Sequence, residues 1–243
     1  MNYNFAIIIP MANEEKDFSL FIIQLTKVLD QLQSGTVYFI VDNASKDNTK
    51  TLCLELSEID NRFQLVWSPE NKNVVDAYMK GYKIAFENMH DLIIEMDAGL
   101  SHDPRAIPMF LRVLNEGNDC AFGSRFINGG SISDSNWKRT FLSKLGTLLS
   151  NIFLGTRMYD MTSGFQGFNR KIVKSFISYE LKSKAHFYQT ELRYLLRKKR
   201  FAEIPIHYTA PSPSVSKKAI YNSIYVLAYY FLKRITFNNE LIK

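Results

Sequence analysis

The chain has 243 residues, of which 46% are hydrophobic and 22% are charged, a composition that excludes a disordered or fibrous protein. Its net charge of +6 is unevenly distributed: residues 1–136 contain 11 basic and 19 acidic residues, whereas residues 137–243 contain 19 basic and 5 acidic ones. The excess of basic residues in the second part indicates an anionic partner, such as lipid or a phosphorylated ligand. A solvated basic face without a partner is the alternative. Nucleic acid is the weakest candidate, because the basic residues form no recognisable binding motif.

Hydrophobic strands and amphipathic helices alternate along the first half of the chain. The spacing of apolar residues predicts strands at 5–10, 37–41, 63–67, 92–96 and 120–123, and helices at 17–32, 47–59, 73–88 and 104–115. Short connections between such elements are typical of an α/β fold, in which a mostly parallel sheet is flanked by helices on both faces. The glycine- and serine-rich segment 128–135 is expected to form a loop over the site.

The second half is mainly helical. We expect helices at 140–154, 184–200 and 217–234, with a short strand at 201–206. The last helix contains nine consecutive apolar residues between two pairs of basic residues, which is shorter than the roughly 20 residues that a membrane span needs. Two interpretations remain open for it, a helix lying in a membrane interface and a buried core helix.

Two further features bear on the compartment. Cys53 and Cys120 both lie in apolar runs, so we expect two buried thiols in a reducing environment rather than a disulfide. The first four residues are polar and uncharged and do not resemble a signal peptide. We therefore expect a cytoplasmic protein.

Polar side chains follow three of the predicted strands. Asn13 and Glu14 come after the first strand, Asp42 after the second and Asp97 after the fourth. Ligands of open α/β sheets bind outside the carboxyl ends of the strands, so these side chains are expected to share one pocket. Because the chain lacks both GxxxxGK[ST] and a GxGxxG after a strand, the pocket suits a nucleotide-sugar better than a bare phosphate or a dinucleotide.

Several short segments stand in a fixed order along the chain: 7–15 (IIIPMANEE), 41–49 (VDNASKDNT), 96–104 (MDAGLSHDP), 123–126 (GSRF), Trp137 with Arg139, 160–165 (DMTSGF), and Gln189 with Glu191. Together they resemble the inverting, GT-A-fold glycosyltransferases of family 2, and among them dolichyl-phosphate mannose synthases and related polyprenyl-phosphate glycosyltransferases. The resemblance covers about residues 5–217.

The resemblance implies a GT-A domain at 1–217, followed at 218–243 by a C-terminal amphipathic helix. If this helix is not part of the core, we expect it to lie in a membrane interface. It implies transfer of a sugar, with inversion, from a nucleotide-diphosphate sugar to polyprenyl phosphate at the cytoplasmic face of an anionic membrane. Two alternatives stay open. In the first alternative, the acceptor is a sugar of a lipid-linked or surface polysaccharide intermediate. In the second, the protein binds sugar nucleotides in a glycan-assembly complex without catalysing transfer.

The resemblance also assigns roles to residues. The residues expected to contact the nucleotide-sugar are Pro10, Asn13, Glu14, Asp42, Ser45, Asp47, Ala98, Arg125 and Lys217. Arg125 and Arg139 are candidates for the acceptor phosphate, and Asp97, Asp160 and Glu191 for catalysis. Asp160 is the preferred general base if the acceptor is a hydroxyl, and Glu191 is the alternative. Asn13 and Asp47 also fit helix N-caps, and His102 is expected to close a turn.

The chain departs from the family pattern at three places around the leaving diphosphate. Gly99 replaces the second aspartate of the Asp-x-Asp motif, residues 73–76 lack the usual glycine, and residues 211–217 keep Ser216 and Lys217 but lack an arginine and a glycine. We therefore expect Mg²⁺ or Mn²⁺ to bind weakly, mainly through the nucleotide, with Asp97 as the protein ligand.

Overall fold

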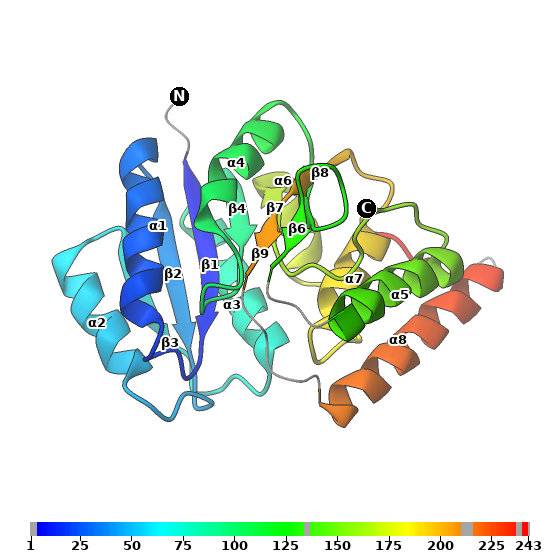
Figure 1. Cartoon of the computed structure of the whole chain (residues 1–243), viewed down its shortest axis with the longest axis horizontal. Coiled ribbons are helices and arrows are strands. Elements are labelled where there is room, and N and C mark those ends of the chain that lie inside the picture. The colour runs from blue at the N-terminus through cyan, green and yellow to red at the C-terminus, as the bar shows by residue number, and fades with distance from the viewer. Residues whose placement is uncertain (1–3, 134–136, 210–215, 237–239, 243) are drawn as a thin grey trace.

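A seven-stranded sheet forms the centre of the protein in the computed structural model, which describes residues 4–133, 137–209, 216–236 and 240–242 (Figure 1). The strand order is β3-β2-β1-β4-β7-β5-β8. The strands are β1 (Phe5–Met11), β2 (Thr36–Val41), β3 (Phe63–Trp67), β4 (Leu92–Glu95), β5 (Cys120–Ser124), β7 (Gln166–Asn169) and β8 (Phe201–Pro205). A separate pair joins β6 (Ser131–Ile132) to β9 (His207–Tyr208).

Every neighbouring pair of strands in the sheet is parallel except those that contain β7, which is antiparallel to both β4 and β5. The mostly parallel sheet that the sequence predicts is confirmed. The sequence did not predict β7, because its four residues, Gln-Gly-Phe-Asn, have no clear alternation. The expected loop at 128–135 is partly ordered as strand β6, and residues 134–136 lie outside the described part of the chain.

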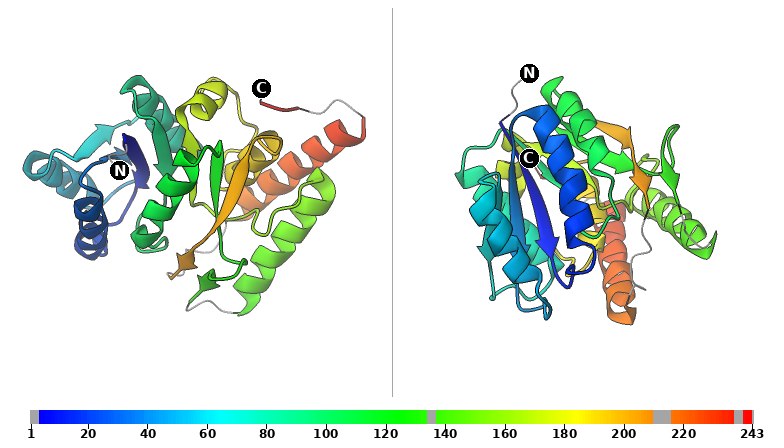
Figure 2. Two further views of the ribbon diagram at one scale, coloured as in Figure 1. Left: turned by 90° about the horizontal axis from the view of Figure 1, so that it is seen from above. Right: turned by 60° about the vertical axis from the view of Figure 1, so that its left-hand side comes forward.

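Helices cover both faces of the sheet (Figure 2, left). They are α1 (Phe18–Leu32), α2 (Thr49–Ile59), α3 (Val74–Glu87), the 3₁₀ turn η1 (Pro104–Ala106), α4 (Ile107–Asn115), α5 (Trp137–Leu154), α6 (Arg170–Phe176), α7 (Phe187–Leu195) and α8 (Lys217–Ile235). Helix α7 is shorter than the predicted 184–200, and the cationic cluster at 197–200 lies beyond its end. Helix α8 begins and ends within a residue of the prediction.

Strand β1 shows why two hydrophobic layers form. Its side chains alternate between the two faces of the sheet. Ala6 and Ile8 join a core with α3, α6, α7 and α8, whereas Ile7 and Ile9 join a second core with α1 and α4. The buried thiols of Cys53 and Cys120 are both free, as the sequence predicts.

Helix α8 is half core and half surface. Val226 and Tyr230 are fully buried in the same core as α7, whereas Ile224 and Tyr225 are exposed. The core interpretation therefore holds for one side of this helix, and the interfacial interpretation stays a prediction for its exposed side. No helix in the described ranges is long and apolar enough to span a membrane.

Candidate active site

The loops that follow β1 and β2 are joined by the side chains of Asn13 and Ser45. Asn13 donates from its amide to the carbonyl of Ala44 at 3.1 Å and accepts from the backbone N–H of Lys46 at 2.9 Å. The Ser45 hydroxyl accepts from the backbone N–H of Asn13 at 3.2 Å. Asn13 itself adopts a left-handed backbone conformation, with φ of 61°. These two side chains therefore hold the two loops together at the strand ends.

Asp47 continues the same loop assembly. Its carboxylate accepts from the Thr49 hydroxyl at 2.6 Å and from the backbone N–H of Glu15 at 3.1 Å. Desolvation raises its pKa, but these hydrogen bonds, with those from the Thr49 N–H and the Ser45 hydroxyl, lower the pKa to about 2. Asp47 thus remains a carboxylate that fixes the turn before α2. The N-cap position is Asn48 in α2 and Asp17 in α1, so the alternative N-cap roles of Asp47 and Asn13 are wrong.

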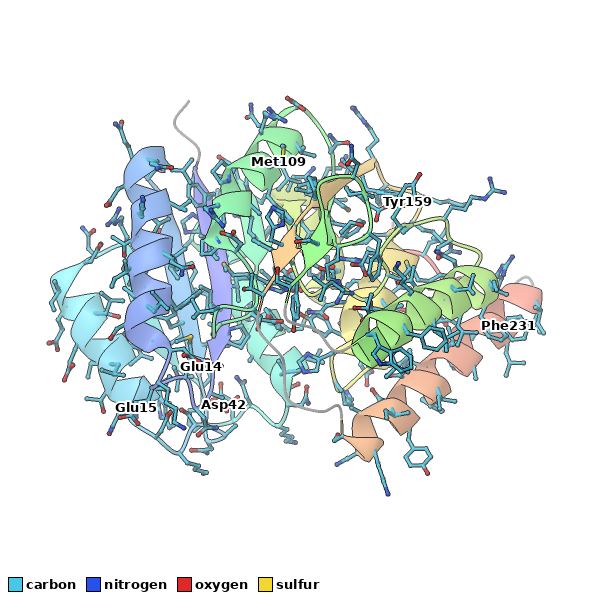
Figure 3. All side chains as sticks on the ribbon, viewed as in Figure 1. Glu14, Glu15, Asp42, Met109, Tyr159 and Phe231 are labelled. Carbon is cyan, nitrogen blue, oxygen red and sulfur yellow. The ribbon has the colours of Figure 1, made fainter. Side chains whose placement is uncertain are left out.

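Glu14 and Asp42 lie together at the carboxyl ends of β1 and β2, as Figure 3 shows. Both are half-buried, and Asp42 accepts from the backbone N–H of Ala44 at 2.8 Å. Burial, together with the neighbouring charges of Asp17, Asp97 and Asp47, raises the pKa of Glu14 to about 7. Half-buried Pro10 precedes this edge on β1. Carboxylates thus gather at the strand ends, where the sequence predicts a pocket.

Asp97 follows β4 and is held by two side chains. Its Oδ1 accepts from the Tyr78 hydroxyl of α3 at 2.6 Å, and its Oδ2 lies 3.9 Å from Nε2 of His102. Because the Asp97 N–H donates to Nδ1 of His102 at 3.0 Å, the proton of the neutral imidazole is on Nε2. Burial lowers the pKa of His102, which keeps it neutral, and His102 closes this turn as expected.

The pKa of Asp97 remains low even though burial raises it, because His102, His186 and the Tyr78 hydrogen bond favour the charged form. Its side chain is 33% exposed, so a ligand can reach it. A Cβ placed on Gly164 would lie 3.2 Å from Oδ2 of Asp97 and 2.7 Å from Nε2 of Gln189. Glycine at 164 therefore keeps open the space beside the carboxylate. Ala98, next in the chain, is buried.

A buried carboxyl that the sequence analysis missed lies beneath Asp97. Glu95 is fully buried on β4 and accepts from the hydroxyls of Tyr82 at 2.6 Å and Tyr188 at 2.8 Å. Burial raises its pKa to about 8, although both tyrosine hydrogen bonds act in the opposite direction. A glutamate at the end of an otherwise apolar strand was the available signal, because a strand of the sheet interior is buried on both faces.

Asp160 is fully buried and paired with Arg125. Its carboxylate accepts from Nε of Arg125 at 2.7 Å and from Nη2 at 2.9 Å, and it also accepts from the backbone N–H of Thr162 at 3.0 Å. Burial raises the pKa of Asp160, but Arg125 and Arg193 keep it below its usual value. This side chain orients Arg125 and has no exposed oxygen with which to act as a general base.

Glu191 does not face the pocket, contrary to the expectation from its helical position. It is fully buried on α7, where its carboxylate accepts from the backbone N–H groups of Lys182 at 2.7 Å and Ser183 at 2.8 Å. The Tyr230 hydroxyl of α8 donates to it at 2.7 Å. The prediction of Glu191 as the alternative base is wrong, because its hydrogen bonds tie α8 and the segment before α7 together.

Arg125 lines a cavity of about 340 Å³ beside the middle of α5. The other lining residues include Lys144, Phe126 and Tyr159. The ring of Tyr208 lies between this cavity and Asp97, since its centroid is 5.8 Å from the His102 ring and 5.7 Å from the guanidinium carbon of Arg125. Tyr208 and His102 thus link this cavity, which Arg125 and Lys144 line, to the carboxylate of Asp97.

Two predicted cationic residues are placed less fully. Arg139 belongs to α5, but its side chain lies outside the described part of the structure. Lys217 is exposed at the first turn of α8, which Ser216 caps by accepting from the Ala219 N–H at 3.2 Å. The altered motif before it, residues 211–215, also lies outside the described residues.

The side chains of the pocket fit a loosely held divalent cation. Such cations prefer carboxylate oxygens, and Mg²⁺ takes few of them from protein when phosphates and waters supply the rest. Among the residues that the structure describes, no group of three or more His, Cys, Asp or Glu is arranged to hold a metal ion. The exposed carboxylate of Asp97 can therefore supply one ligand to a cation that a bound diphosphate carries.

A model of the family described as "Glycosyl transferase family 2" matches residues 6–176. The chain belongs to this family. The match begins in β1 and ends in α6, so it includes Asp42, Asp97, Arg125 and Asp160. The resemblance carried by the sequence motifs is confirmed, and the protein is a glycosyltransferase.

Two relatives resemble this glycosyltransferase over most of its length. Polyprenol monophosphomannose synthase of Mycolicibacterium smegmatis is 28% identical over 214 residues, which cover 87% of this chain and 79% of that protein. Undecaprenyl-phosphate mannosyltransferase of Micrococcus luteus is 26% identical over 212 residues, which cover 86% and 85%. Both belong to the subgroup that the motifs indicated.

Solved structures share the fold of this family 2 member. Glucosyl-3-phosphoglycerate synthase of Mycobacterium tuberculosis in complex with UDP superposes with a TM-score of 0.65 at 16% identity and covers 96% of this chain and 80% of its own. The same enzyme with Mn²⁺ and UDP-glucose gives a TM-score of 0.65 at 15% identity and covers 96% and 78%. At this identity the likeness concerns the fold alone, and it confirms the expected GT-A architecture.

Proposed function

We propose that this glycosyltransferase moves a sugar, with inversion, from a nucleotide-diphosphate sugar to polyprenyl phosphate. The burial of both candidate bases supports this choice of acceptor. A sugar hydroxyl needs a base within hydrogen-bond reach, whereas a phosphate monoester is already an anionic nucleophile. Asp160 and Glu191 are fully buried and hydrogen-bonded, so neither serves that purpose, and a phosphate acceptor needs neither.

One half of the proposed site binds the nucleotide-sugar and the other binds the acceptor phosphate. Pro10, Glu14 and Asp42 at the strand ends receive the nucleoside, with Asn13, Ser45 and Asp47 holding the loops around it. Asp97 and Ala98 face the diphosphate-sugar, to which Lys217 contributes from α8. Arg125, aided by Arg139, binds the acceptor phosphate in the cationic cavity beside Tyr208.

A divalent cation, Mg²⁺ or Mn²⁺, completes the proposed site. When bound with the nucleotide it neutralises charge that develops on the leaving diphosphate. Asp97 is its protein ligand, and weak binding in the absence of nucleotide follows from glycine at position 99. The structural neighbour was solved with Mn²⁺ and UDP-glucose, which supports this assignment.

We place the reaction at an anionic membrane surface on the cytoplasmic face. The basic C-terminal part and the exposed side of α8 support a membrane partner. The two free, buried cysteines suit a reducing compartment.

A matched pair of acceptors tests the proposal. Purified protein is incubated with labelled GDP- and UDP-sugars, together with either polyprenyl phosphate or the same polyprenol without its phosphate. We expect lipid-extractable label only with the phosphorylated acceptor, and we expect Arg125→Lys to raise the KM for it. Equal labelling of the dephosphorylated polyprenol, or no label with any donor, contradicts the proposal.

A further inference from the structure

Position 99, where glycine replaces the second aspartate of the Asp-x-Asp motif, lies against the carboxylate of Glu14. A Cβ placed on Gly99 would lie 2.6 Å from Oε2 of Glu14 and 3.4 Å from its Cδ. Gly99 also has a φ of 69°, in the left-handed region that glycine adopts without a steric penalty. The carboxylate of Glu14 therefore fills the space in which a side chain at position 99 would begin.

The backbone of Glu14 is held on both sides. Its N–H donates to the hydroxyl of fully buried Thr49 at 2.8 Å, and its carbonyl accepts from the backbone N–H of Asp17 at 3.2 Å. Glu14 is itself half-buried. Because these contacts fix the backbone of Glu14, the approach of its carboxylate to Gly99 follows from the fold of the loop after β1.

Glu14 and Asp97 reach the same turn from neighbouring strands. Strands β1 and β4 are parallel, with Ile8 opposite Glu95, so the loops that follow them leave the same end of the sheet. Gly99 is the second residue after Asp97, and its contact with Glu14 brings the two carboxylates to one turn. Because the side chain of Asp97 is 33% exposed there, a ligand bound at this turn can meet both carboxylates.

The negative charge at this turn is not compensated by basic side chains. The charges that act on the carboxyl group of Glu14 are those of Asp17, Asp97 and Asp47, and all three are negative. None of the ion pairs within the described ranges of the chain includes Glu14. Two carboxylates at one turn repel each other, whereas a divalent cation between them attracts both. This end of the sheet therefore suits a cation better than it suits a bare diphosphate.

We propose that Glu14 supplies the second carboxylate ligand of the divalent cation, in place of the aspartate that the chain lacks at position 99. This inference rests on the cation of the proposed function, and it adds a protein ligand to Asp97. Mg²⁺ at sites of this kind is bound through one or two carboxylates, while substrate phosphates and waters supply its other ligands. Glu14 and Asp97 make up such a pair, so no third carboxylate is required.

The coupling between Mn²⁺ and a nucleoside diphosphate tests this role without any transfer reaction. Calorimetric titration gives the Kd of GDP and of UDP, each in EDTA and in excess Mn²⁺. The nucleotide that binds the wild type more tightly is then used for the variants, and the ratio of its two Kd values is the coupling factor. We expect Glu14→Gln to lower this factor at least about fivefold and to change the Kd in EDTA by less than about threefold.

Two further variants control for charge and for position. Glu14→Ala with Gly99→Asp moves the carboxylate from one loop to the other and removes the close contact at 2.6 Å, so we expect it to restore the coupling factor to within about threefold of the wild type. Asp17→Asn makes the same change of charge as Glu14→Gln at an exposed residue whose side chain caps no helix. We expect this matched control to keep the wild-type factor. Circular dichroism checks that every variant is folded.

Three results overturn the inference. If Glu14→Gln weakens nucleotide binding equally in EDTA and in Mn²⁺, Glu14 contacts the nucleoside alone. If the folded double variant couples as weakly as Glu14→Gln, a carboxylate at position 99 does not replace that of Glu14. If Mn²⁺ leaves nucleotide binding to the wild type unchanged, the site holds no cation.

The acceptor assay decides the proposed function separately. Transfer to polyprenyl phosphate that persists in EDTA overturns the role of Glu14 as a cation ligand and leaves the transfer reaction standing. A wild type that couples Mn²⁺ to nucleotide through Glu14 but transfers sugar to no polyprenyl phosphate supports the cation site and overturns the proposed acceptor.

Discussion

Asp160→Asn separates an orienting role from a catalytic one. The wild-type carboxylate is fully buried and accepts two hydrogen bonds from the Arg125 guanidinium, at 2.7 and 2.9 Å, besides those from backbone N–H groups. Asparagine turns an N–H group toward one of these donors and leaves the buried guanidinium without its counter-ion. Breaking a buried pair in this way costs about 3–5 kcal/mol, a large part of a typical folding free energy.

The measurement is urea denaturation followed by circular dichroism. With an m-value of about 3 kcal/mol per molar urea, the midpoint of Asp160→Asn should fall by about 1–1.7 M. The matched control is Glu70→Gln, because Glu70 pairs with Lys80 at 3.3 Å and both side chains are exposed, by 62% and 40%. Because water screens this exposed pair, it contributes little to stability and the midpoint should move little.

Activity of the same variant completes the test. If Asp160 orients Arg125, Asp160→Asn should raise the KM for polyprenyl phosphate as it lowers stability. A variant with the wild-type urea midpoint, an unchanged KM and a kcat reduced by about a thousandfold would instead identify Asp160 as a base, and would refute the reasoning from burial.

Three further predictions concern other parts of the site. Because the folded-state pKa of Glu14 is raised to about 7, its protonation stabilises the fold below about pH 4.5, and this contribution is lost as pH rises to about 7. Thermal melts of the nucleotide-free protein should therefore show the melting temperature of Glu14→Gln rising relative to that of the wild type across that interval. A difference in melting temperature that stays constant with pH would contradict this. Tyr78→Phe removes the 2.6 Å hydrogen bond to Asp97 and should lower kcat about tenfold to a hundredfold, whereas Tyr82→Phe, which leaves that bond intact, serves as its control. Glu191→Gln should lower the free energy of unfolding by about 1–3 kcal/mol and leave the activity per folded molecule unchanged, and a large loss of kcat in a stable variant would restore it as a base candidate.

The gathering of polar residues at the carboxyl ends of β1, β2 and β4 could be predicted from sequence because it follows from topology alone. Each hydrophobic strand ends at a recognisable polar residue, and parallel strands bring their carboxyl ends together wherever they are placed in the sheet. Asp42 and Asp97 were found in this way. The left-handed turn at Asn13 and the mutual hydrogen bonds of the loops were not, because they depend on pairings between residues more than thirty positions apart.

The burial of polar side chains near the site could not be predicted from sequence patterns. Asp160 and Glu191 have the residue types of catalytic carboxylates, and only the fold shows that neighbouring donors enclose them. Likewise Tyr78 reads as one apolar position of a helix until its hydroxyl is placed against Asp97. Helix α7 was predicted too long because a cationic cluster is favourable at the C-terminal end of a helix. In the structure the cluster at 197–200 instead follows the end of the helix at Leu195.

The single antiparallel strand has a consequence for the order in which the chain can fold during synthesis. Strand β7 lies between β4 and β5, yet it is encoded more than forty residues after β5. Until residue 169 has left the ribosome, the edge of β4 and the inner edge of β5 both lack their neighbour. Unpaired strand edges can form a sheet with another chain and so promote aggregation. We therefore expect chaperones to bind nascent chains whose synthesis has stalled between residues 124 and 166.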